Sequence, residues 1–495
     1  MHRKHGLLPL QLGLDPGAGR PLHAQVREAL RAAILAGRLA PGARLPASRG
    51  LAADLGCARG TVLLALEQLV AEGYLTTRAG SGTRVAATLP DDLLSRPRGP
   101  AGAPAPSAAP PVLSRRGARL AAASAAGLPG DGAGAFALGR PALDAFPFET
   151  WARLLQAEWR HGACAHPHPL GDPRLRRAVA AYLSAGRGVA CTEDAVIVTS
   201  GIRQSLRLVA ELLLDPGEAA LVEEPGFPGL SRALRDAGLA TVPVPVGPHG
   251  FDAGRARALA PEARLAVVTP AQHYPLGTMM GPENRLALLA WAEARDGFVV
   301  EDDYDGEYRY AGRPLAPLHA LDRAGRVIYA GSFSKVLLPA LQLSYLVLPP
   351  ALVAPVSRAL AGAGIAASAL GQGALARFLD EGHFAAHLRR TRRLYAARQA
   401  ALVAAARRHL AGLLDVPPLE GGLHLVARPV PDRAARFEDE AAVAACARAG
   451  VTVTALSPYF ADRAAAKPGL LLGYAGVPER AVEPAVLRMA AALRA

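Results

Sequence analysis

A stretch with no periodic apolar pattern divides this sequence near residue 100. Residues 97–111 read P-R-G-P-A-G-A-P-A-P-S-A-A-P-P, in which 13 of 15 residues are Pro, Ala or Gly. Because proline lacks a backbone donor and has a fixed φ, such a stretch forms neither a helix nor a central strand. We expect a semi-extended linker, prolonged by Gly and Ala over about 121–135. The expected organisation is a head over residues 15–87, a linker over 88–134 and a body over 135–495.

The composition allows both parts to fold around sizeable cores, since 51% of the residues are hydrophobic and 20% are charged. No run of about 18 uncharged apolar residues occurs, so we expect no membrane span. The four cysteines, Cys57, Cys164, Cys191 and Cys446, have no C-x-x-C spacing. We therefore expect a cytoplasmic protein without structural disulfides and without a metal site.

Positive charge is concentrated at the start of the chain. Residues 1–120 hold 16 Lys and Arg against 7 Asp and Glu, whereas the remaining 375 residues hold 39 against 35. An arginine-rich composition alone would spread the excess of positive charge evenly along the chain. The observed distribution indicates that the head binds a polyanion.

The head has the pattern of a winged helix-turn-helix. Apolar residues spaced by four from Leu22 to Ile34 predict a first helix. A short second helix is expected to run through Leu55 with Ser48 as its cap, and Gly56 ends it. A third helix is predicted over 58–72, with its buried side formed by Val62, Leu66, Leu69 and Val70. Two β-prone segments, 74–78 and 83–85, flank a glycine-rich tip and form the wing.

On this frame the basic residues are placed for DNA. Arg59 and Thr61 lie in the first turn of the third helix, which enters the major groove. Arg49 lies at the start of the second helix, where a phosphate is bound by side chain and helix N-terminus together. Arg78 and Arg84 flank the wing tip. For any one of these arginines, the alternative to a DNA contact is an ordinary solvated position on the surface.

The motifs P-G-A-R-L-P-A-S-R-G-L-A, R-G-T-V and A-E-G-Y-L-T-T-R-A-G-S-G-T-R-V resemble the DNA-binding domain of the GntR family of bacterial regulators. The resemblance implies that the partner is a double-stranded DNA operator. With Arg78 added from the wing argument, the expected DNA-binding residues are Arg44, Ser48, Arg49, Arg59, Thr61, Arg78, Gly80, Gly82 and Thr83. Ala58 stands where the family often has a capping Ser, and Leu63 where some members have a further DNA-contacting Arg.

The body reads as an α/β domain with a mostly parallel sheet. Buried strands are predicted over 195–198, 219–222, 265–268, 297–300 and 327–330, with helices between them, for example over 204–214 and 285–294. Ligands of such sheets bind at the carboxyl ends of the strands. The residues that follow each strand are therefore the candidates for a site.

Three of these strand ends carry suitable chemistry. Thr199–Gln204 opens a helix, whose N-terminal N–H groups can bind a phosphate. Glu301–Asp305 offers a carboxylate for a protonated ring nitrogen, or else an acidic surface loop. Gly331–Lys335 carries one of only three lysines among 52 arginines. Lysine forms a Schiff base and arginine does not, although a surface lysine is the simpler alternative.

Together these features predict a pyridoxal 5'-phosphate (PLP) site. The body resembles the fold-type I aminotransferases, and D-P-R-L-R-R, V-E-E-P-G-F-P-G, V-T-P-A-Q-H-Y-P-L-G, V-E-D-D-Y-D-G-E-Y-R-Y and G-S-F-S-K resemble the MocR subfamily, in which a GntR head is fused to an aminotransferase-like domain. The resemblance implies Lys335 as the Schiff-base lysine, Asp302 at the pyridine nitrogen, Tyr304 at the phenolic oxygen and Phe227 on the ring. Phosphate contacts are expected from Ser332 and the backbone of Gly201, Ile202 and Arg203, and Tyr274 completes the cofactor-binding set.

Three departures from the subfamily pattern stand out. Gln342 replaces an Arg that usually binds the phosphate, and our hypothesis is that Arg203 supplies the missing cation. Ser344 replaces a common Gly. Leu471 and Gly229 stand where the GABA-responsive regulator of the subfamily has arginines for a substrate carboxylate, which argues against an amino-acid effector held in that way.

The predicted function is a DNA-binding transcriptional regulator that senses a small molecule, either PLP itself or an amine that forms an aldimine. Relatives form head-to-tail homodimers, which we expect here too. A working aminotransferase with an accessory DNA-binding head is the alternative, so the residues leave enzymatic turnover open. A body that has lost PLP and only holds a dimer together is a third possibility, favoured by Gln342.

Overall fold

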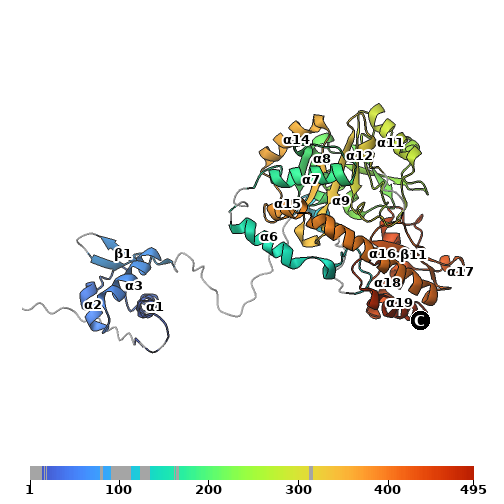
Figure 1. Ribbon diagram of the computed structural model, residues 1–495. Helices are drawn as coiled ribbons and strands as arrows, with labels where there is room; N and C mark the ends of the chain where they lie inside the picture. Colours follow the sequence, from blue (N-terminus) through green and yellow to red (C-terminus); the bar gives the residue numbers. More distant parts are fainter. Residues whose placement is uncertain are drawn as a thin grey trace, which may run out of the picture. The chain divides into compact units, whose positions relative to one another are not determined.

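The computed structural model describes residues 14–15, 17, 19–78, 82–90, 113–122, 134–160, 162, 167–311 and 316–494 (Figure 1). The chain divides into two compact units, Met1–Val112 and Leu113–Ala495. The finer boundaries expected at residues 88 and 134 stay predictions. Within the described ranges, no helix is long and apolar enough to cross a membrane, and no group of His, Cys, Asp and Glu is placed to hold a metal.

The head folds as three helices and a wing, as predicted. Its elements are α1 (Leu22–Leu35), α2 (Ser48–Asp54), α3 (Arg59–Ala71), β1 (Leu75–Arg78) and β2 (Gly82–Val85). β1 and β2 pair antiparallel. Residues 42–45 join the same sheet, since the N–H of Leu45 donates to the carbonyl of Thr83 (2.9 Å) and that of Val85 to Ala43 (2.9 Å).

Two details of the predicted head are wrong. Ser48 is the first residue of α2 and not its cap; the cap is Ala47, which has no side-chain hydrogen bond to offer. Val70 lies on the solvent side of α3, because the buried stripe of that helix is formed by Val62, Ala65, Leu66 and Leu69.

The body contains a seven-stranded sheet, which confirms the α/β class. Its order is β3-β9-β8-β7-β6-β4-β5, and only β9 runs antiparallel to its neighbours. The strands are β3 (Val196–Thr199), β4 (Ala219–Glu224), β5 (Ala240–Pro245), β6 (Leu265–Val268), β7 (Phe298–Asp303), β8 (Val327–Ser332) and β9 (Ser344–Val347).

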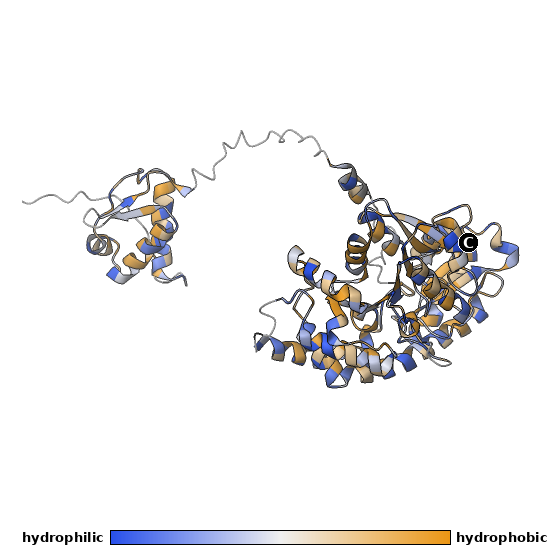
Figure 2. Cartoon of the chain, turned by 90° about the horizontal axis from the view of Figure 1, so that it is seen from above, coloured by the Kyte–Doolittle hydropathy of each residue, from blue (hydrophilic) through white to orange (hydrophobic). Residues whose placement is uncertain are grey.

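Helices cover both faces of this sheet. One face packs on α8 (Ile202–Leu213), α9 (Pro228–Asp236) and α14 (Pro350–Ala363) through one apolar cluster. The other face packs on α6 (Phe148–Arg160), α7 (Pro173–Gly186), α10 (Ala253–Leu259), α11 (Pro282–Ala294) and α15 (Gln372–Asp380) through two more. In Figure 2 the outer helices of the body carry both hydrophilic and hydrophobic residues, as expected for helices with one face on a core.

A smaller four-stranded sheet, in the order β10-β11-β13-β12, lies in the C-terminal part of the body. Its strands are β10 (Leu414–Asp415), β11 (His424–Pro429), β12 (Thr454–Ala455) and β13 (Leu470–Gly473), and its helices are α16 (His383–His409), α18 (Asp439–Arg448) and α19 (Glu479–Arg494). The remaining helical turns are α5 (Arg115–Ala122), α12 (Leu318–Leu321), α13 (Phe333–Val336), α17 (Pro431–Ala434), η1 (Leu143–Ala145), η2 (Glu193–Ala195), η3 (Pro339–Leu341) and η4 (Ser457–Tyr459). α5 lies inside the predicted linker, in a stretch that contains no proline.

Candidate functional site

The carboxyl ends of β7 and β8 and the start of α8 meet at one pocket of about 310 Å³, a volume in the range of small-molecule sites. All nine residues predicted to bind the cofactor line it. The complete lining is Leu138, Gly139, Ser200, Gly201, Ile202, Arg203, Phe227, Thr269, Tyr274, Asp302, Tyr304, Ser332, Ser334, Lys335, Gln342, Leu423 and His424.

Residues at the start of α8 line the pocket and have the chemistry to bind an anion. Gly201 caps α8 with φ +124°, a conformation that side-chain-bearing residues rarely adopt, and the first N–H groups of the helix have no partner within it. Ser332 caps α13 by accepting from the N–H of Ser334 (3.2 Å) and contacts Ser344 (3.1 Å). The exposed guanidinium of Arg203 lies in the first turn of α8.

The pocket also holds a buried acid, Asp302, and a half-buried amine, Lys335. β7 continues through Asp302 and Asp303, which are both buried, so the alternative of an acidic surface loop does not hold for these two residues. Burial, reinforced by the Asp303 charge, raises the pKa of Asp302 to about 7, although the charge of Lys335 opposes the shift. Burial lowers the pKa of Lys335. A cationic ring nitrogen at Asp302 would favour its ionised form.

Aromatic side chains also line the pocket. The Phe227 ring meets Tyr274 edge-on at 5.5 Å, and Tyr274 meets Tyr304 in the same way at 5.6 Å. The buried Tyr304 hydroxyl has no hydrogen-bond partner of normal geometry. Burial, followed by the nearby Asp305 carboxylate, raises the pKa of Tyr304. A buried donor without a partner is costly, and a ligand oxygen in the pocket would satisfy it.

The sequence did not single out Thr269 or His424, which also line the pocket. Thr269 follows directly after β6, so the strand-end rule could have found it; its hydroxyl donates to the buried Glu223 carboxyl (2.6 Å). His424 begins β11 and its ring contacts the carbonyl of Pro275 (2.8 Å). No sequence pattern indicates that His424 lines the pocket, because only the tertiary fold brings the small sheet there.

Three residues that depart from the subfamily pattern, Gln342, Leu471 and Gly229, lie in different surroundings. Gln342 lines the pocket with φ +46°. Leu471 is fully buried in an apolar cluster that also contains the pocket residue Leu138. A Cβ at Gly229 would come within 2.6 Å of the Phe227 ring, so an unchanged backbone has no room for a longer side chain there.

The predicted DNA-binding residues lie on the head's second and third helices and on its wing. Arg59 begins α3, and its Nε donates to the Ser48 hydroxyl (3.3 Å) at the start of α2. In the wing, Gly82 pairs with Arg78 and has φ +81°, and a Cβ there would approach the Arg44 guanidinium at 3.2 Å. The other residues of the predicted set are Arg49 and Thr61 in these helices and Thr83 in β2; Gly80 lies outside the described residues.

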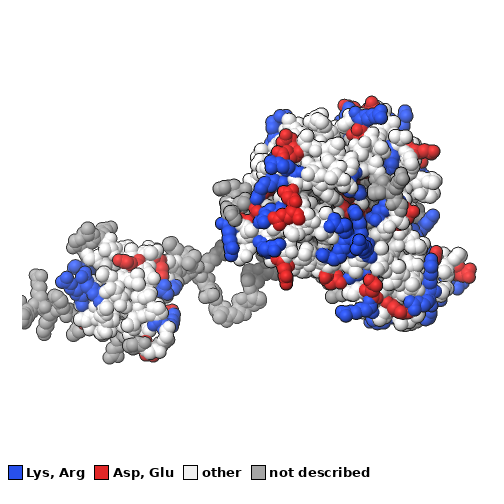
Figure 3. All heavy atoms as spheres, in the orientation of Figure 1, with Lys and Arg blue, Asp and Glu red and all other residues white. Residues whose placement is uncertain are grey.

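Charge is distributed differently over the two units. On the face of the head seen in Figure 3, one group of basic side chains gathers at the left edge, and further basic side chains lie at the right edge near acidic ones; both signs are interspersed on the visible face of the body. Within the wing, Arg84 donates to the carbonyl of Gly42 (3.0 Å), so its guanidinium also holds the wing together.

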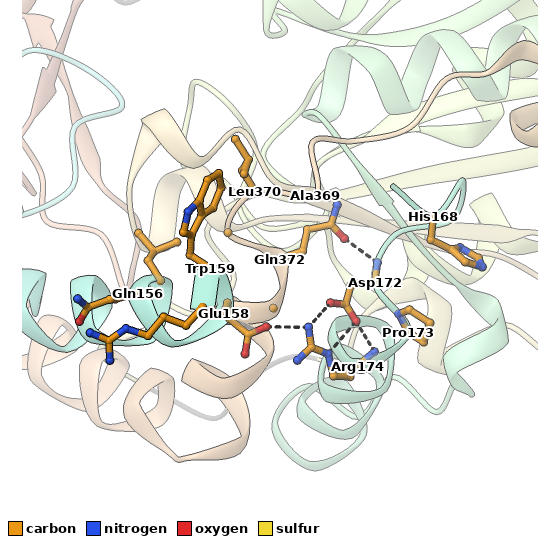
Figure 4. Close-up of a pocket in the computed structure, with 14 residues that line it drawn as sticks. Gln156, Glu158, Trp159, His168, Asp172, Pro173, Arg174, Ala369, Leu370 and Gln372 are labelled. Atoms are coloured by element: carbon orange, nitrogen blue, oxygen red, sulfur yellow. Dashed lines mark hydrogen bonds and ion pairs between the residues drawn. The ribbon is translucent and has the colours of Figure 1, made fainter. Parts of the chain in front are cut away.

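A larger hollow of about 810 Å³ lies between α6, the start of α7 and residues 369–373 (Figure 4). Its polar groups bond to one another: Arg174 pairs with Asp172 (2.7 Å) and Glu158 (2.8 Å). Its rim carries Trp159 and Leu370, which are 68% and 60% exposed. None of the predicted cofactor or DNA residues lines it.

Comparison with known proteins agrees with both units. The model of bacterial regulatory proteins of the gntR family matches residues 22–85, and the model of aminotransferase class I and II matches residues 139–487. The probable rhizopine catabolism regulatory protein MocR of Rhizobium meliloti is 44% identical, over 94% of this chain and 92% of that protein. The pyridoxine biosynthesis transcriptional regulator PdxR of Corynebacterium glutamicum is 33% identical, over 94% and 95%.

Solved structures share the fold of the body. The α-aminoadipate aminotransferase LysN of Thermus thermophilus, complexed with N-(5'-phosphopyridoxyl)-L-leucine, has a TM-score of 0.66 at 27% identity, over 74% of this chain and 92% of that one. The kynurenine aminotransferase of Pyrococcus horikoshii has a TM-score of 0.65 at 24% identity, over 73% and 90%.

A GntR-type DNA-binding head followed by a body with the fold of PLP-dependent aminotransferases defines a class of transcriptional regulators. The chain belongs to the MocR subfamily of the GntR family.

Proposed function

We propose that this regulator binds PLP in the 310 Å³ pocket and that occupancy of the pocket changes the affinity of the head for DNA. The observation that carries the proposal is the meeting of Lys335, Asp302 and the α8 N-terminus around one cavity. When bound, PLP supplies an aldehyde that reacts with primary amines. Lys335 would provide the amine, Asp302 would hold the protonated ring nitrogen, and Ser332 and the α8 N-terminus would hold the phosphate.

The remaining contacts fit the same group. The Tyr304 hydroxyl, which has no hydrogen-bond partner of normal geometry, supports a bond to the phenolic oxygen, and the Phe227 ring supports stacking on the pyridine. Burial lowers the pKa of Lys335, which favours the neutral and nucleophilic form of the amine. The effector is then PLP itself or an amine that competes with Lys335.

α9 joins the pocket to the chain segment that leads to the head. Its cap residue is Phe227, whose ring lines the pocket. At its other end, Arg116 of α5 donates to the carbonyl of Asp236 (2.6 Å), and Arg232 of α9 donates to that of Leu120 in α5 (3.4 Å). A ligand that moves the Phe227 ring therefore acts on the helix to which α5 is attached, which supports coupling between the pocket and the head.

The exposed apolar side chains Trp159 and Leu370 support a homodimer, since large exposed apolar groups on one hollow mark interaction surfaces. We propose the head-to-tail arrangement, in which two heads read two half-sites. Trp159→Ser should lower the mass measured by light scattering from dimer to monomer at low protein concentration.

The test of the cofactor is the visible absorption spectrum of the purified protein, with and without added PLP, beside Lys335→Ala. We expect a band that depends on Lys335. Lys467→Ala is the matched control, because that residue lies far along the chain from the pocket motifs and lines no part of the pocket; it should leave the band unchanged.

A protein without a band at saturating PLP would contradict the cofactor assignment and would favour a body that serves only as a scaffold. An assay of keto-acid formation from α-amino acids separates the regulator from a working aminotransferase. Sustained formation over many turnovers would support the enzyme.

A further inference from the structure

Exposed leucines lie on α3, the helix that corresponds to the DNA-reading helix of the head. Leu63 is 36% exposed and Leu64 is 43% exposed, although Val62 and Ala65 beside them are fully buried. Single exposed leucines are common on protein surfaces. What distinguishes Leu63 is its position relative to the basic residues of the head.

Leu63 shares a face of α3 with Arg59. Residues four apart in a helix lie one above the other on the same side. Arg59 is the first residue of α3, and its contact with the Ser48 hydroxyl (3.3 Å) joins it to the start of α2, where Arg49 is exposed. Leu63 is therefore the next side chain along the stripe that begins with Arg59.

The chemistry of leucine restricts what it can read. A helix-turn-helix places the N-terminal residues of its second helix against base edges in the major groove. Leucine has no donor or acceptor, and the apolar group that B-DNA presents in this groove is the C5-methyl of thymine. We propose that Leu63 reads a thymine methyl in each half-site of the operator, beside a base or phosphate contacted by Arg59.

The proposal rests on DNA binding by the head and assigns a specificity-determining residue to it. The experiment uses the full-length protein. Duplexes that bind are selected from a random library, and each dT of the selected sequence is replaced in turn by dU, which removes the methyl and keeps the hydrogen-bonding groups. The dissociation constant is measured at one fixed salt concentration, because affinity for DNA depends steeply on salt.

For the wild-type protein we expect one dT→dU replacement per half-site to weaken binding about fourfold, the effect of exposing one buried methyl-sized group. Leu63→Ala should bind the dT and dU duplexes with equal affinity. Val70→Ala is the matched control: Val70 is 37% exposed and lies seven residues further along nearly the same stripe, near the end of the helix. It should keep the fourfold difference.

Three results would overturn the proposal: selected sequences without a fixed thymine, a wild-type affinity that is indifferent to every methyl, or a Leu63→Ala protein that retains the full methyl effect. In the third case, Leu63→Ala weakens binding to the dT and dU duplexes by the same factor, and the side chain then acts at a protein contact. Failure to select any duplex would instead contradict the DNA-binding assignment itself.

Discussion

Arg203 and Gln342 line the same pocket, and only Arg203 carries a charge. If Arg203 replaces the arginine that relatives have at position 342, Arg203→Ala should weaken PLP binding. A hydrogen bond to a charged group contributes about 1.5–3 kcal/mol, and Arg203 is exposed to screening solvent, so we expect a loss of about tenfold. The measurement is a titration of the apoprotein with PLP, followed by absorbance.

Two comparisons isolate the phosphate. Binding of pyridoxal, which lacks it, should be the same in Arg203→Ala and wild type. Arg207→Ala serves as the control, because Arg207 lies one turn further along α8 and is paired with Glu211 (2.7 Å). Gln342→Arg should restore PLP affinity in the Arg203→Ala background. Equal PLP affinity of Arg203→Ala and wild type would refute the hypothesis that Arg203 supplies the cation that is missing at position 342.

Asp302 makes the stability of the apoprotein depend on pH. Its pKa is raised to about 7 in the folded state, whereas an unfolded aspartate titrates near 4. Between these values the folded state holds a proton that the unfolded chain has released, so stability falls as pH rises through this window, by up to about 1.4 kcal/mol per pH unit. Asp302→Asn should remove this part of the dependence.

The measurement is urea unfolding of the body at several pH values between 4 and 8, without PLP. The exposed Asp415 provides the control, since Asp415→Asn should leave the slope unchanged. Saturating PLP should flatten the wild-type dependence, because a cationic ring nitrogen favours the ionised carboxylate. An Asp302→Asn protein with the wild-type slope would contradict a pKa raised by burial at this residue.

At the scale of elements, α9 is the connection that the proposed coupling requires. Arg116→Ala removes the side-chain bond from α5 to the C-terminal end of α9. We expect PLP affinity to stay unchanged and the effect of PLP on DNA affinity to shrink. By linkage, the effect of DNA on PLP affinity should shrink by the same factor, and fluorescence titrations in both directions measure the two effects.

Arg235→Ala is the control for this experiment. Arg235 lies in the last turn of α9 but contacts Thr241 (3.4 Å) within the body. Unchanged coupling in Arg116→Ala, or an equal loss in both variants, would show that the contact between α5 and α9 does not carry the signal.

At the scale of the whole molecule, the two units have separate cores. The head core is built from residues of α1, α2, α3 and the wing, together with the segment up to Leu89. We therefore expect two thermal transitions by calorimetry. PLP should raise only the transition of the body and operator DNA only that of the head, since a ligand stabilises the unit that binds it. A single cooperative transition would contradict independent cores.

Short-range patterns were enough to predict much of this protein. The spacing of Val26, Leu30 and Ile34 predicts α1 because a 3.6-residue period places them on one face. The strand-end rule led to Lys335, Asp302 and Gly201, because parallel strands bring their carboxyl ends to one edge of a sheet. The errors were local. α2 begins at Ser48, one residue earlier than predicted, and Val70 lies on the exposed side of α3 instead of its buried side.

The sequence by itself determined the two-part organisation, the fold classes and the residue types of the pocket, because periodicity, strand ends and a rare lysine are all encoded in neighbouring residues. Only the tertiary structure decided what meets across long separations. It brought His424 of the small sheet to the pocket, buried Leu471 in one cluster with Leu138 and joined α5 to the end of α9. Such contacts depend on how whole layers pack, and no local pattern of the chain specifies them.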